Sequence, residues 1–235
     1  MSGNTHTGRD VSRGGSRGIP MRQNVRAWLT TAYEKMEHHF GKLHWWPGET
    51  AFEVAVGAIL TQNTAWSNVE RALERLKTAG LMDENRLYET SLPELIEAIR
   101  PAGFYNLKAK RLGAFLGFLH ERYGGLMENM FTEETDVLRE ELLSVRGIGQ
   151  ETADSILLYG DNRPLFVVDA YTRRILERHG ILSQSWSYGD IQKMFMDNLP
   201  LDGTLYNQYH ALIVSTGKHF CRATARCEGC PLQGM

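Results

Sequence analysis

Apolar residues recur along most of this chain at intervals of three or four, the spacing that gives an α-helix one buried face. This pattern predicts a series of helices joined by polar or Gly- and Pro-containing segments. The predicted helices cover residues 24–40, 50–64, 67–80, 95–101, 132–143, 169–179, 191–198 and 205–216, with two more opening near residues 105 and 150. The apolar run 165–168 is too short and isolated to indicate a sheet. The pattern therefore predicts an all-α protein.

Composition narrows this picture. The chain has 235 residues, of which 42% are hydrophobic, so it can bury the core of one or two domains. Residues 1–23 are rich in Gly, Ser, Thr and Arg and predict a disordered tail, or a true start at Met21. No apolar run reaches the roughly 20 residues of a membrane span, so we expect an intracellular protein. A net charge of -2 does not exclude DNA binding, which needs only a local positive surface.

The chain is organised around residues 142–174. A helical run ends at Val145, a turn containing Gly147 and Gly149 follows, and a second helical run begins. Both glycines permit backbone geometry that a side chain would obstruct. The amide N–H groups at the start of the second helix are left exposed, and such a start can hold a phosphate. After this helix, a loop containing Pro164 leads to Asp169 at the start of another helix.

This segment resembles the helix-hairpin-helix, Gly/Pro loop and aspartate of the endonuclease III superfamily of DNA glycosylases. The matching residues are Gly147-Ile148-Gly149, Thr152-Ala153, Pro164 and Val167-Val168-Asp169. The hairpin alone would also fit an ordinary turn between packed helices. The resemblance implies two helical lobes, with a six-helix barrel that carries the hairpin over 46–164. Residues 24–45 and 165–235 would form a terminal-helix lobe with a C-terminal cysteine loop, and Asp169 would line the cleft.

Two acidic residues carry the expected chemistry. Breaking the bond between a base and deoxyribose builds positive charge on the sugar, which a fixed carboxylate such as Asp169 stabilises. Asp169 can also act simply as an N-cap, and both roles are compatible. Glu151 stands where bifunctional relatives carry a lysine, eighteen residues before Asp169. A carboxylate cannot form a Schiff base, so lyase activity on abasic sites is not expected. Glu151 would hydrogen-bond a flipped purine, assist water, or merely favour the first helical turn.

Aromatic residues suggest a base pocket. Trp45, Trp46 and Pro47 precede a turn, and Trp66 stands just before the predicted helix over 67–80. The tryptophans either plug a domain junction or stack on an extruded base. With Glu151, they are similar to the bacterial 3-methyladenine DNA glycosylase branch, which implies that all four residues build the pocket beside Asp169. An N-alkylated purine is cationic, and aromatic faces beside a carboxylate suit it.

Other residues are candidates for DNA contact. Gln62 matches the family's glutamine that fills the gap left by a flipped nucleotide, although a helix-ending polar residue is the alternative. The hairpin residues expected at DNA are Arg146, Gly147, Ile148 and Gly149. Residues 103–109 resemble the element G-[FLY]-Y-x-x-K-A of the same family, and the cations of this region face either DNA or solvent. They are Lys108, Lys110 and Arg111.

Three cysteines, Cys221, Cys227 and Cys230, lie close to the end of the sequence. Their spacing suits an iron–sulfur cluster or zinc and argues against a disulfide scaffold. The family pattern, C-x6-C-x2-C-x5-C, holds a [4Fe–4S] cluster. Here the first gap is one residue shorter, and the fourth cysteine would fall one position past Met235. The resemblance implies a cluster, while a clipped chain, another ligand or a vestigial loop remain open.

These expectations combine into one function. We expect a monofunctional DNA glycosylase of base excision repair that flips and excises an alkylated purine, such as 3-methyladenine, from double-stranded DNA. It would act as a monomer in the cytoplasm, associated with the nucleoid. The alternatives are a glycosylase for another damaged or mismatched base, and a non-catalytic helix-hairpin-helix protein that binds DNA. Asp169 argues against the last.

Overall fold

A computed structural model describes residues 25–43, 45–46, 48–182 and 185–235. The predicted tail over 1–23 and the predicted pocket residue Pro47 lie outside this part. The described residues form twelve α-helices and one short 3-10 helix, η1. They are α1 (Val25–Phe40), α2 (Ala51–Leu60), α3 (Trp66–Thr78), α4 (Glu84–Glu89), α5 (Leu92–Ile99), η1 (Arg100–Ala102), α6 (Tyr105–Tyr123), α7 (Met127–Met130), α8 (Thr135–Ser144), α9 (Gln150–Asp161), α10 (Ala170–Arg178), α11 (Tyr188–Asn198) and α12 (Gly203–His219).

The all-α prediction is confirmed. Within the described ranges, the one β-type pairing is an isolated bridge between Cys221 and Ala225. The predicted helix over 50–64 is too long, because α2 ends at Leu60 and Asn63 adopts a left-handed φ of 55°. Helices α4 and α7 were not predicted, since six and four residues are too few to show a period.

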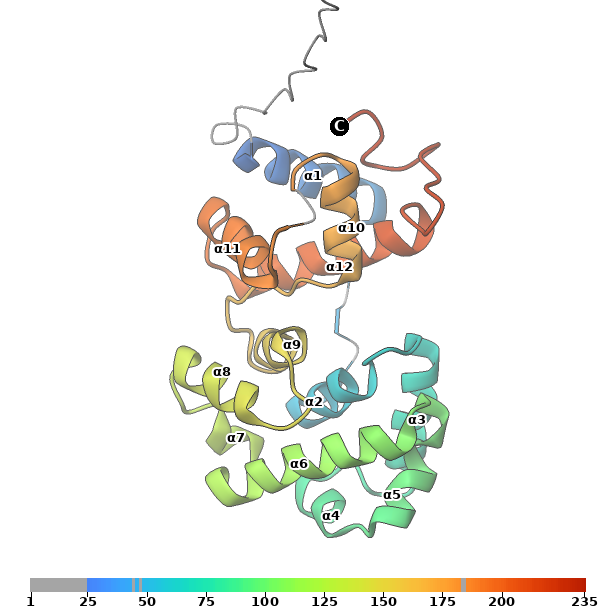
Figure 1. The fold of residues 1–235 in the computed structure, drawn as a ribbon, viewed down its shortest axis with the longest axis vertical. Helices are drawn as coiled ribbons and strands as arrows, with labels where there is room; N and C mark the ends of the chain where they lie inside the picture. The colour runs from blue at the N-terminus through green and yellow to red at the C-terminus, as the bar shows by residue number, and fades with distance from the viewer. Residues whose placement is uncertain (1–24, 44, 47, 183–184) are drawn as a thin grey trace, which may run out of the picture.

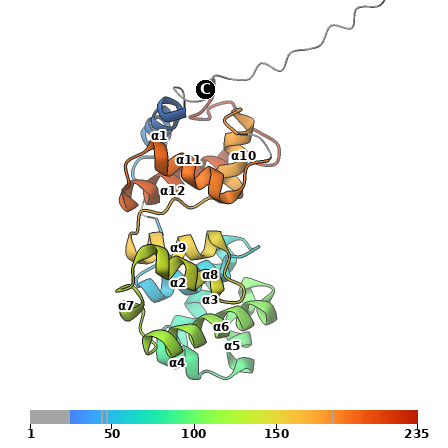
Figure 2. The ribbon, with the colours of Figure 1, turned by 60° about the vertical axis from the view of Figure 1, so that its left-hand side comes forward.

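The hydrophobic core is divided into two clusters. One is built from α2, α3, α5, α6, α8 and α9, and the other from α1, α10, α11, α12 and the segment 166–168. Figure 1 shows the two groups of helices as separate lobes, with α9 on the side of the larger lobe that faces the smaller one. Figure 2 shows the same separation after a turn of 60°. The predicted division near residues 46 and 164 stays a prediction.

Helix α2 lies at the centre of the larger lobe. Nine of its ten residues are buried, and its sequence is almost entirely apolar. A helix that is apolar on every side is buried on every side, and α9, α3 and α6 pack against α2. No helix in the described ranges is both long and apolar enough to cross a membrane.

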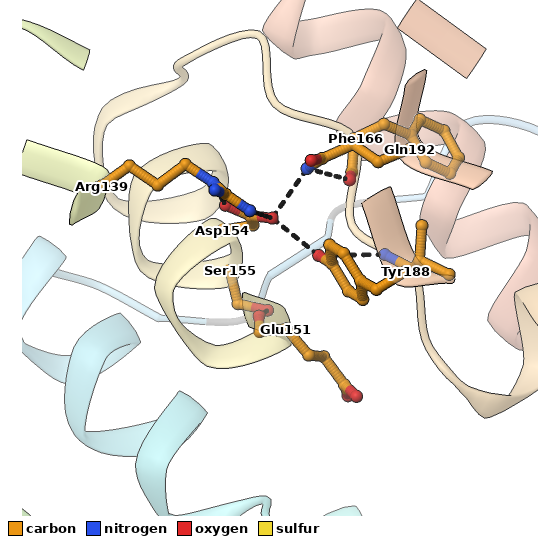
Figure 3. Close-up of polar contacts among 8 residues, drawn as sticks. Arg139, Glu151, Asp154, Ser155, Phe166, Tyr188 and Gln192 are labelled. Atoms are coloured by element: carbon orange, nitrogen blue, oxygen red, sulfur yellow. Dashed lines mark hydrogen bonds and ion pairs between the residues drawn. The ribbon is translucent and has the colours of Figure 1, made fainter. Parts of the chain in front are cut away.

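A buried polar network joins the two lobes (Figure 3). Asp154 of α9 is fully buried and pairs with Arg139 of α8, with 2.6 Å between Nε and Oδ1. From α11, the Tyr188 hydroxyl and the Gln192 amide donate to Asp154 Oδ2 over 2.8 Å and 2.7 Å. The same amide also donates to the Phe166 carbonyl over 2.9 Å. A buried carboxylate with this many partners fixes the lobes relative to each other.

Candidate active site

The hairpin between α8 and α9 has two glycines with different roles. Gly147 has φ +94°, and a Cβ there would lie 2.5 Å from Cγ of Arg111, so a side chain is excluded as predicted. Gly149 has an ordinary φ of -100°, and no protein atom of the described residues lies within 4 Å of the position of its Cβ. The prediction that a side chain would be obstructed at Gly149 is therefore wrong for the protein alone.

The remaining hairpin residues are also of two kinds. Ile148 is 5% exposed, packs in the larger core, and donates its backbone N–H to the Val145 carbonyl over 3.0 Å. It anchors the turn. Arg146 is exposed and free to reach DNA. The predicted contacts with DNA at these positions stay predictions.

The start of α9 is open. Within the described part of the chain, no side chain accepts a hydrogen bond from its first turn, and its N-cap is Gly149. The first N–H groups of a helix have no partner inside the helix and carry partial positive charge. The start of α9 therefore offers donors to an anion.

Asp169 occupies the start of α10 as the N-cap. Its Oδ1 accepts hydrogen bonds from the Thr172 backbone N–H over 2.7 Å and from the Thr172 hydroxyl over 2.9 Å. Its Oδ2 lies 3.7 Å from His210 Nε2. Burial alone would raise the pKa of Asp169, but His210 and the bonds from Thr172 outweigh it and lower the pKa. The carboxylate therefore stays ionised, with one oxygen anchored and the other turned to His210.

A cavity of about 1010 Å³ lies in front of Asp169. It brings together most of the predicted site residues, from both lobes. Those that line it are Trp45, Trp46, Gln62, Trp66, Gly147, Gly149, Glu151 and Asp169. Arg146 and Ile148 do not line it.

Trp46 is the centre of an aromatic wall. Its ring stacks on Tyr159, with 5.1 Å between centroids and 25° between planes. Trp66 meets it edge to face, with 4.8 Å between centroids, and Trp45 does so at 5.9 Å. All three tryptophans are half-buried and line the cavity, so they fill the junction between the lobes and also form one wall of the pocket. The Lys218 ammonium lies over the Trp45 ring, 5.4 Å from its centroid.

Glu151 lies in the first turn of α9 and lines the cavity. In Figure 3 its side chain extends away from the Asp154 network. The surrounding protein raises the pKa of Glu151, and the negative charge of Asp169 raises it further, while His210 acts in the opposite direction. Two carboxylates thus share one cavity, with pKa values displaced in opposite directions. This is typical of sites that assign different protonation states to neighbouring acids.

Gln62 is held against the hairpin. Its Nε2 donates to the Gly147 carbonyl over 3.0 Å and to the Thr152 hydroxyl over 2.9 Å, and Arg111 donates to its Oε1. Lys108 faces neither DNA nor solvent, which corrects the prediction. It is 1% exposed, and its Nζ donates to the Ala102 carbonyl over 2.7 Å. Burial, together with the charge of Arg111, lowers the pKa of Lys108 to about 8.

The sequence analysis missed three residues that line the cavity, His210, Tyr188 and Lys218, and it also missed Tyr159, which contacts His210 and Trp46 behind that lining. His210 is 5% exposed, and its Nδ1 lies 2.5 Å from the Tyr159 hydroxyl. The Tyr188 hydroxyl accepts the backbone N–H of Val168 over 3.4 Å, next to Asp169. No local pattern marks these residues, because each meets its partners across long stretches of sequence.

The C-terminal cysteines do not form a metal centre as placed. In the described ranges, no three His, Cys, Asp or Glu side chains come together in a way that could hold a metal. Cys221 Sγ accepts a hydrogen bond from Arg178 over 3.2 Å, and Cys227 is exposed. Burial raises the pKa of Cys230, and the nearby thiols of Cys227 and Cys221 add to this. The predicted cluster stays a prediction, and no step of the chemistry below passes through it.

Proteins with this helical fold, hairpin and following aspartate are the helix-hairpin-helix DNA glycosylases. Residues 56–201 match the HhH-GPD superfamily of base excision DNA repair proteins, and the chain belongs to this family. The predicted membership of the endonuclease III superfamily is thereby confirmed, as is the coarser prediction of a base excision repair glycosylase.

Two relatives illustrate the family in sequence. The chain is 48% identical over 214 residues to a provisionally named DNA repair glycosylase of Methanocaldococcus jannaschii, covering 91% of this chain and 97% of that protein. It is 27% identical over 183 residues to endonuclease III of Thermotoga maritima, covering 77% and 80% of the two chains.

Solved structures agree. The H. pylori 3-methyladenine DNA glycosylase bound to 1,N6-ethenoadenine superposes with a TM-score of 0.71 at 31% identity, covering 83% of this chain and 97% of that one. A non-covalent complex of endonuclease III with DNA gives a TM-score of 0.75 at 22% identity, over 88% and 92% of the chains, which establishes the shared fold alone.

Proposed function

We propose that this protein is a monofunctional DNA glycosylase that flips an alkylated purine out of double-stranded DNA and hydrolyses its bond to deoxyribose. One observation carries the proposal. An ionised Asp169, with one oxygen turned away from its cap, lies at a cavity walled by three tryptophans and Glu151. We propose that the protein acts as a single copy, in the cytoplasm near the nucleoid.

Asp169 supplies the charge that the reaction needs. As the base leaves, positive charge grows on the sugar, and a fixed carboxylate beside C1′ stabilises that state. Water then attacks C1′ and loses its proton, and the electrons of the broken bond leave with the base. A base that already carries a positive charge leaves as a neutral molecule, so little further activation is needed.

The cavity suits a flat, cationic base. Indole faces attract a cation, and the two carboxylates, Glu151 and Asp169, add negative charge to the same space. The similar H. pylori structure, a 3-methyladenine DNA glycosylase bound to 1,N6-ethenoadenine, supports a modified purine as the substrate class. We therefore propose 3-methyladenine or a related alkylated purine as the substrate.

Lys218 favours a second candidate. Its ammonium lies at the Trp45 ring on the cavity wall, and a cation there would repel a cationic base. A neutral damaged or mismatched base would not be repelled. The second candidate function is therefore excision of such a base by the same Asp169 chemistry.

We propose the open start of α9 as the site that binds a DNA phosphate. Gly149 leaves room for a phosphate to approach the backbone, and the unpaired N–H groups of the first turn would donate to it. Exposed Arg146 would add charge. Gln62 would have to exchange its hydrogen bonds with Gly147 and Thr152 for contacts with DNA when a nucleotide leaves the stack.

Lyase activity is not expected, because residue 151 is a glutamate. Among the described residues that line the cavity, the one lysine is Lys218, which stands on α12 rather than on the hairpin. Incubation with abasic DNA and borohydride tests both points. We expect no covalent adduct, and an adduct lost in Lys218→Ala would overturn the proposed absence of lyase chemistry.

The test of the function is base release from a panel of substrates. It contains methylated DNA and oligonucleotides carrying 1,N6-ethenoadenine, oxidised pyrimidines, uracil or mismatches. Release of alkylated purines supports the first candidate, and release of neutral bases alone supports the second. DNA binding without any release would overturn both and favour a non-catalytic DNA-binding protein. Visible absorbance of purified protein, with iron and sulfide analysis, tests the predicted [4Fe–4S] cluster.

A further inference from the structure

His210 has an unusual position for a histidine on a buried helix face. It is 5% exposed, yet it lines the cavity, and its Nε2 has no hydrogen-bond partner among the described residues. The other ring nitrogen, Nδ1, lies 2.5 Å from the Tyr159 hydroxyl. A buried polar atom without a partner is costly, so its place next to a functional carboxylate requires an explanation.

The hydrogen positions follow from counting donors and acceptors. The Tyr159 hydroxyl has one hydrogen, and the described residues offer it no acceptor other than His210 Nδ1. Burial raises the pKa of Tyr159 far above its usual value, and the Asp169 charge adds to this, so the hydroxyl keeps its proton and donates. Nδ1 is then an acceptor, which places the ring proton of a neutral imidazole on Nε2.

That proton is directed at the catalytic carboxylate. Nε2 lies 3.7 Å from Asp169 Oδ2, the oxygen that Thr172 does not bind. The opposite tautomer would place two lone pairs against each other at this distance. The separation is longer than a hydrogen bond, and such contacts often shorten when substrate binds.

We propose that His210 is a positioning residue for Asp169. The Tyr159 hydroxyl holds its imidazole as the neutral Nε2–H tautomer, and this N–H orients Asp169 Oδ2 for reaction. In this role His210 transfers no proton. This inference rests on the proposed glycosylase function and deepens it.

The aromatic wall is part of the same arrangement. Tyr159 stacks on Trp46 with one face and holds His210 with its hydroxyl. The pocket that receives the base is therefore mechanically connected to the carboxylate that acts on the sugar. The chain of contacts runs from α9 through α12 to the start of α10.

Three variants of His210 distinguish the roles of its two ring nitrogens. In His210→Gln the amide nitrogen replaces Nε2 and can still donate to Asp169. In His210→Asn the shorter amide replaces Nδ1 and can only meet Tyr159, and His210→Phe removes both. We expect single-turnover base release to fall about 100-fold in the Phe and Asn variants and less than about tenfold in the Gln variant. The affinity for DNA that carries an abasic-site analogue should be unchanged in all three.

The acid limb of the rate profile adds a second readout. His210 lowers the pKa of Asp169, so its loss raises that pKa and should move the acid limb to higher pH in the Phe and Asn variants only. Among the described residues, Glu151 and Tyr159 of α9 are also electrostatically coupled to Asp169, and Tyr188 and Lys218 line the same cavity. All four are unchanged in these variants. Equal rates in all three variants, or equal losses in all three, would overturn the proposal.

The tautomer can be measured without any substrate. Nitrogen-15 spectra of ring-labelled protein should show a neutral His210 with its proton on Nε2, identified among eight histidines by its absence in the Gln variant. In Tyr159→Phe, which keeps the ring on Trp46, a share of the other tautomer should appear. A charged His210 ring, or the neutral tautomer with its proton on Nδ1, in the wild-type protein would contradict the inference. If the wild-type protein releases no base, the proposed function fails, while this spectrum still decides the inference.

Discussion

Helices α9 and α10 both begin at the same cavity, but a side chain caps the first turn of α10 and none caps that of α9 within the described ranges. The start of α10 is closed by the protein's own carboxylate, because Asp169 accepts the Thr172 N–H. The start of α9 has Gly149 as its N-cap, and no side chain caps it within the described ranges. A good N-cap adds to stability, and the uncapped start of this 12-residue helix leaves its first N–H donors available to the phosphate that we propose.

The difference explains the division of labour that we propose. The open start binds the phosphate backbone, while the capped start holds the carboxylate that meets the sugar. In Asp169 one oxygen makes the cap, and the other remains for chemistry. In this proposal the cap also orients the carboxylate for chemistry, so the N-cap and catalytic interpretations of Asp169 are compatible.

The largest expected effect comes from Asp169→Asn. Asparagine caps a helix about as well as aspartate, so the free energy of unfolding should change by less than about 1 kcal/mol. Base release should fall at least about 1,000-fold, because the charge that stabilises the sugar cation is gone. Single-turnover kinetics and thermal melting measure the two quantities. Base release at the wild-type rate would refute the mechanism.

The second expected effect concerns the buried Asp154 network, which joins the lobe that contains α9 to the lobe that contains α10. Asp154→Ala leaves the partly buried Arg139 without its partner and removes an acceptor from Tyr188 and Gln192. We expect a loss of about 3–5 kcal/mol in stability, measured by chemical denaturation. Arg122→Ala, which breaks an exposed pair with Glu141, is the matched control and should cost less than about 1 kcal/mol. Similar losses in both variants would mean that the network does not hold the lobes together.

The third effect has opposite signs for stability and binding. Gly149→Asp places a better N-cap on α9 in space that is open, so stability should rise by a few tenths of a kcal/mol, roughly. It also places a negative charge where a phosphate would approach, so DNA affinity should fall about 100-fold. The control is Gly147→Ala, which should destabilise the fold by more than about 1 kcal/mol, because of the contact with Arg111 and φ +94°. Unchanged affinity in Gly149→Asp would show that the open start does not bind DNA.

The smallest effect is expected at Glu151. Its pKa is raised in the folded protein, so the ionised form is disfavoured there, and its charge reduces stability above that pKa. Glu151→Gln should therefore raise the melting temperature slightly near pH 7, and the gain should vanish below about pH 4, where glutamate is protonated in the unfolded chain. Asp169 behaves oppositely: its lowered pKa contributes stability above the unfolded-state value, which is lost as the pH falls through the folded-state value. If the higher melting temperature of Glu151→Gln persists at low pH, the charge of Glu151 is not its cause.

Features encoded locally could be predicted from the sequence. The glycine hairpin, the cap at Asp169, the adjacent tryptophans and most helices follow from periodicity and turn chemistry over a few residues. The resemblance to a family supplied the separation of Glu151 from Asp169 and with it the candidate pocket. These are the parts of the site for which short segments contain the whole signal.

The remaining features depend on packing between distant segments. His210 is 41 residues from Asp169 in sequence, and nothing in its own helix marks it as a partner of that carboxylate. Lys108 looks like a solvated cation in its segment, but the fold buries it against the Ala102 carbonyl. The glycines of the hairpin look equivalent in sequence, and only the fold distinguishes Gly147, with φ +94° and Arg111 against it, from Gly149.

Single-turnover base release at saturating enzyme, compared between Gly149→Asp and Asp169→Asn, tests the division between the two helix starts most directly. At enough protein to saturate the DNA, the Gly149→Asp variant should recover a rate close to that of the wild-type protein, because only binding is weakened. The Asp169→Asn variant should stay inactive however much protein is added. An equal loss of the base-release rate in both variants at saturation would contradict the assignment of DNA binding to the start of α9 and of chemistry to the start of α10.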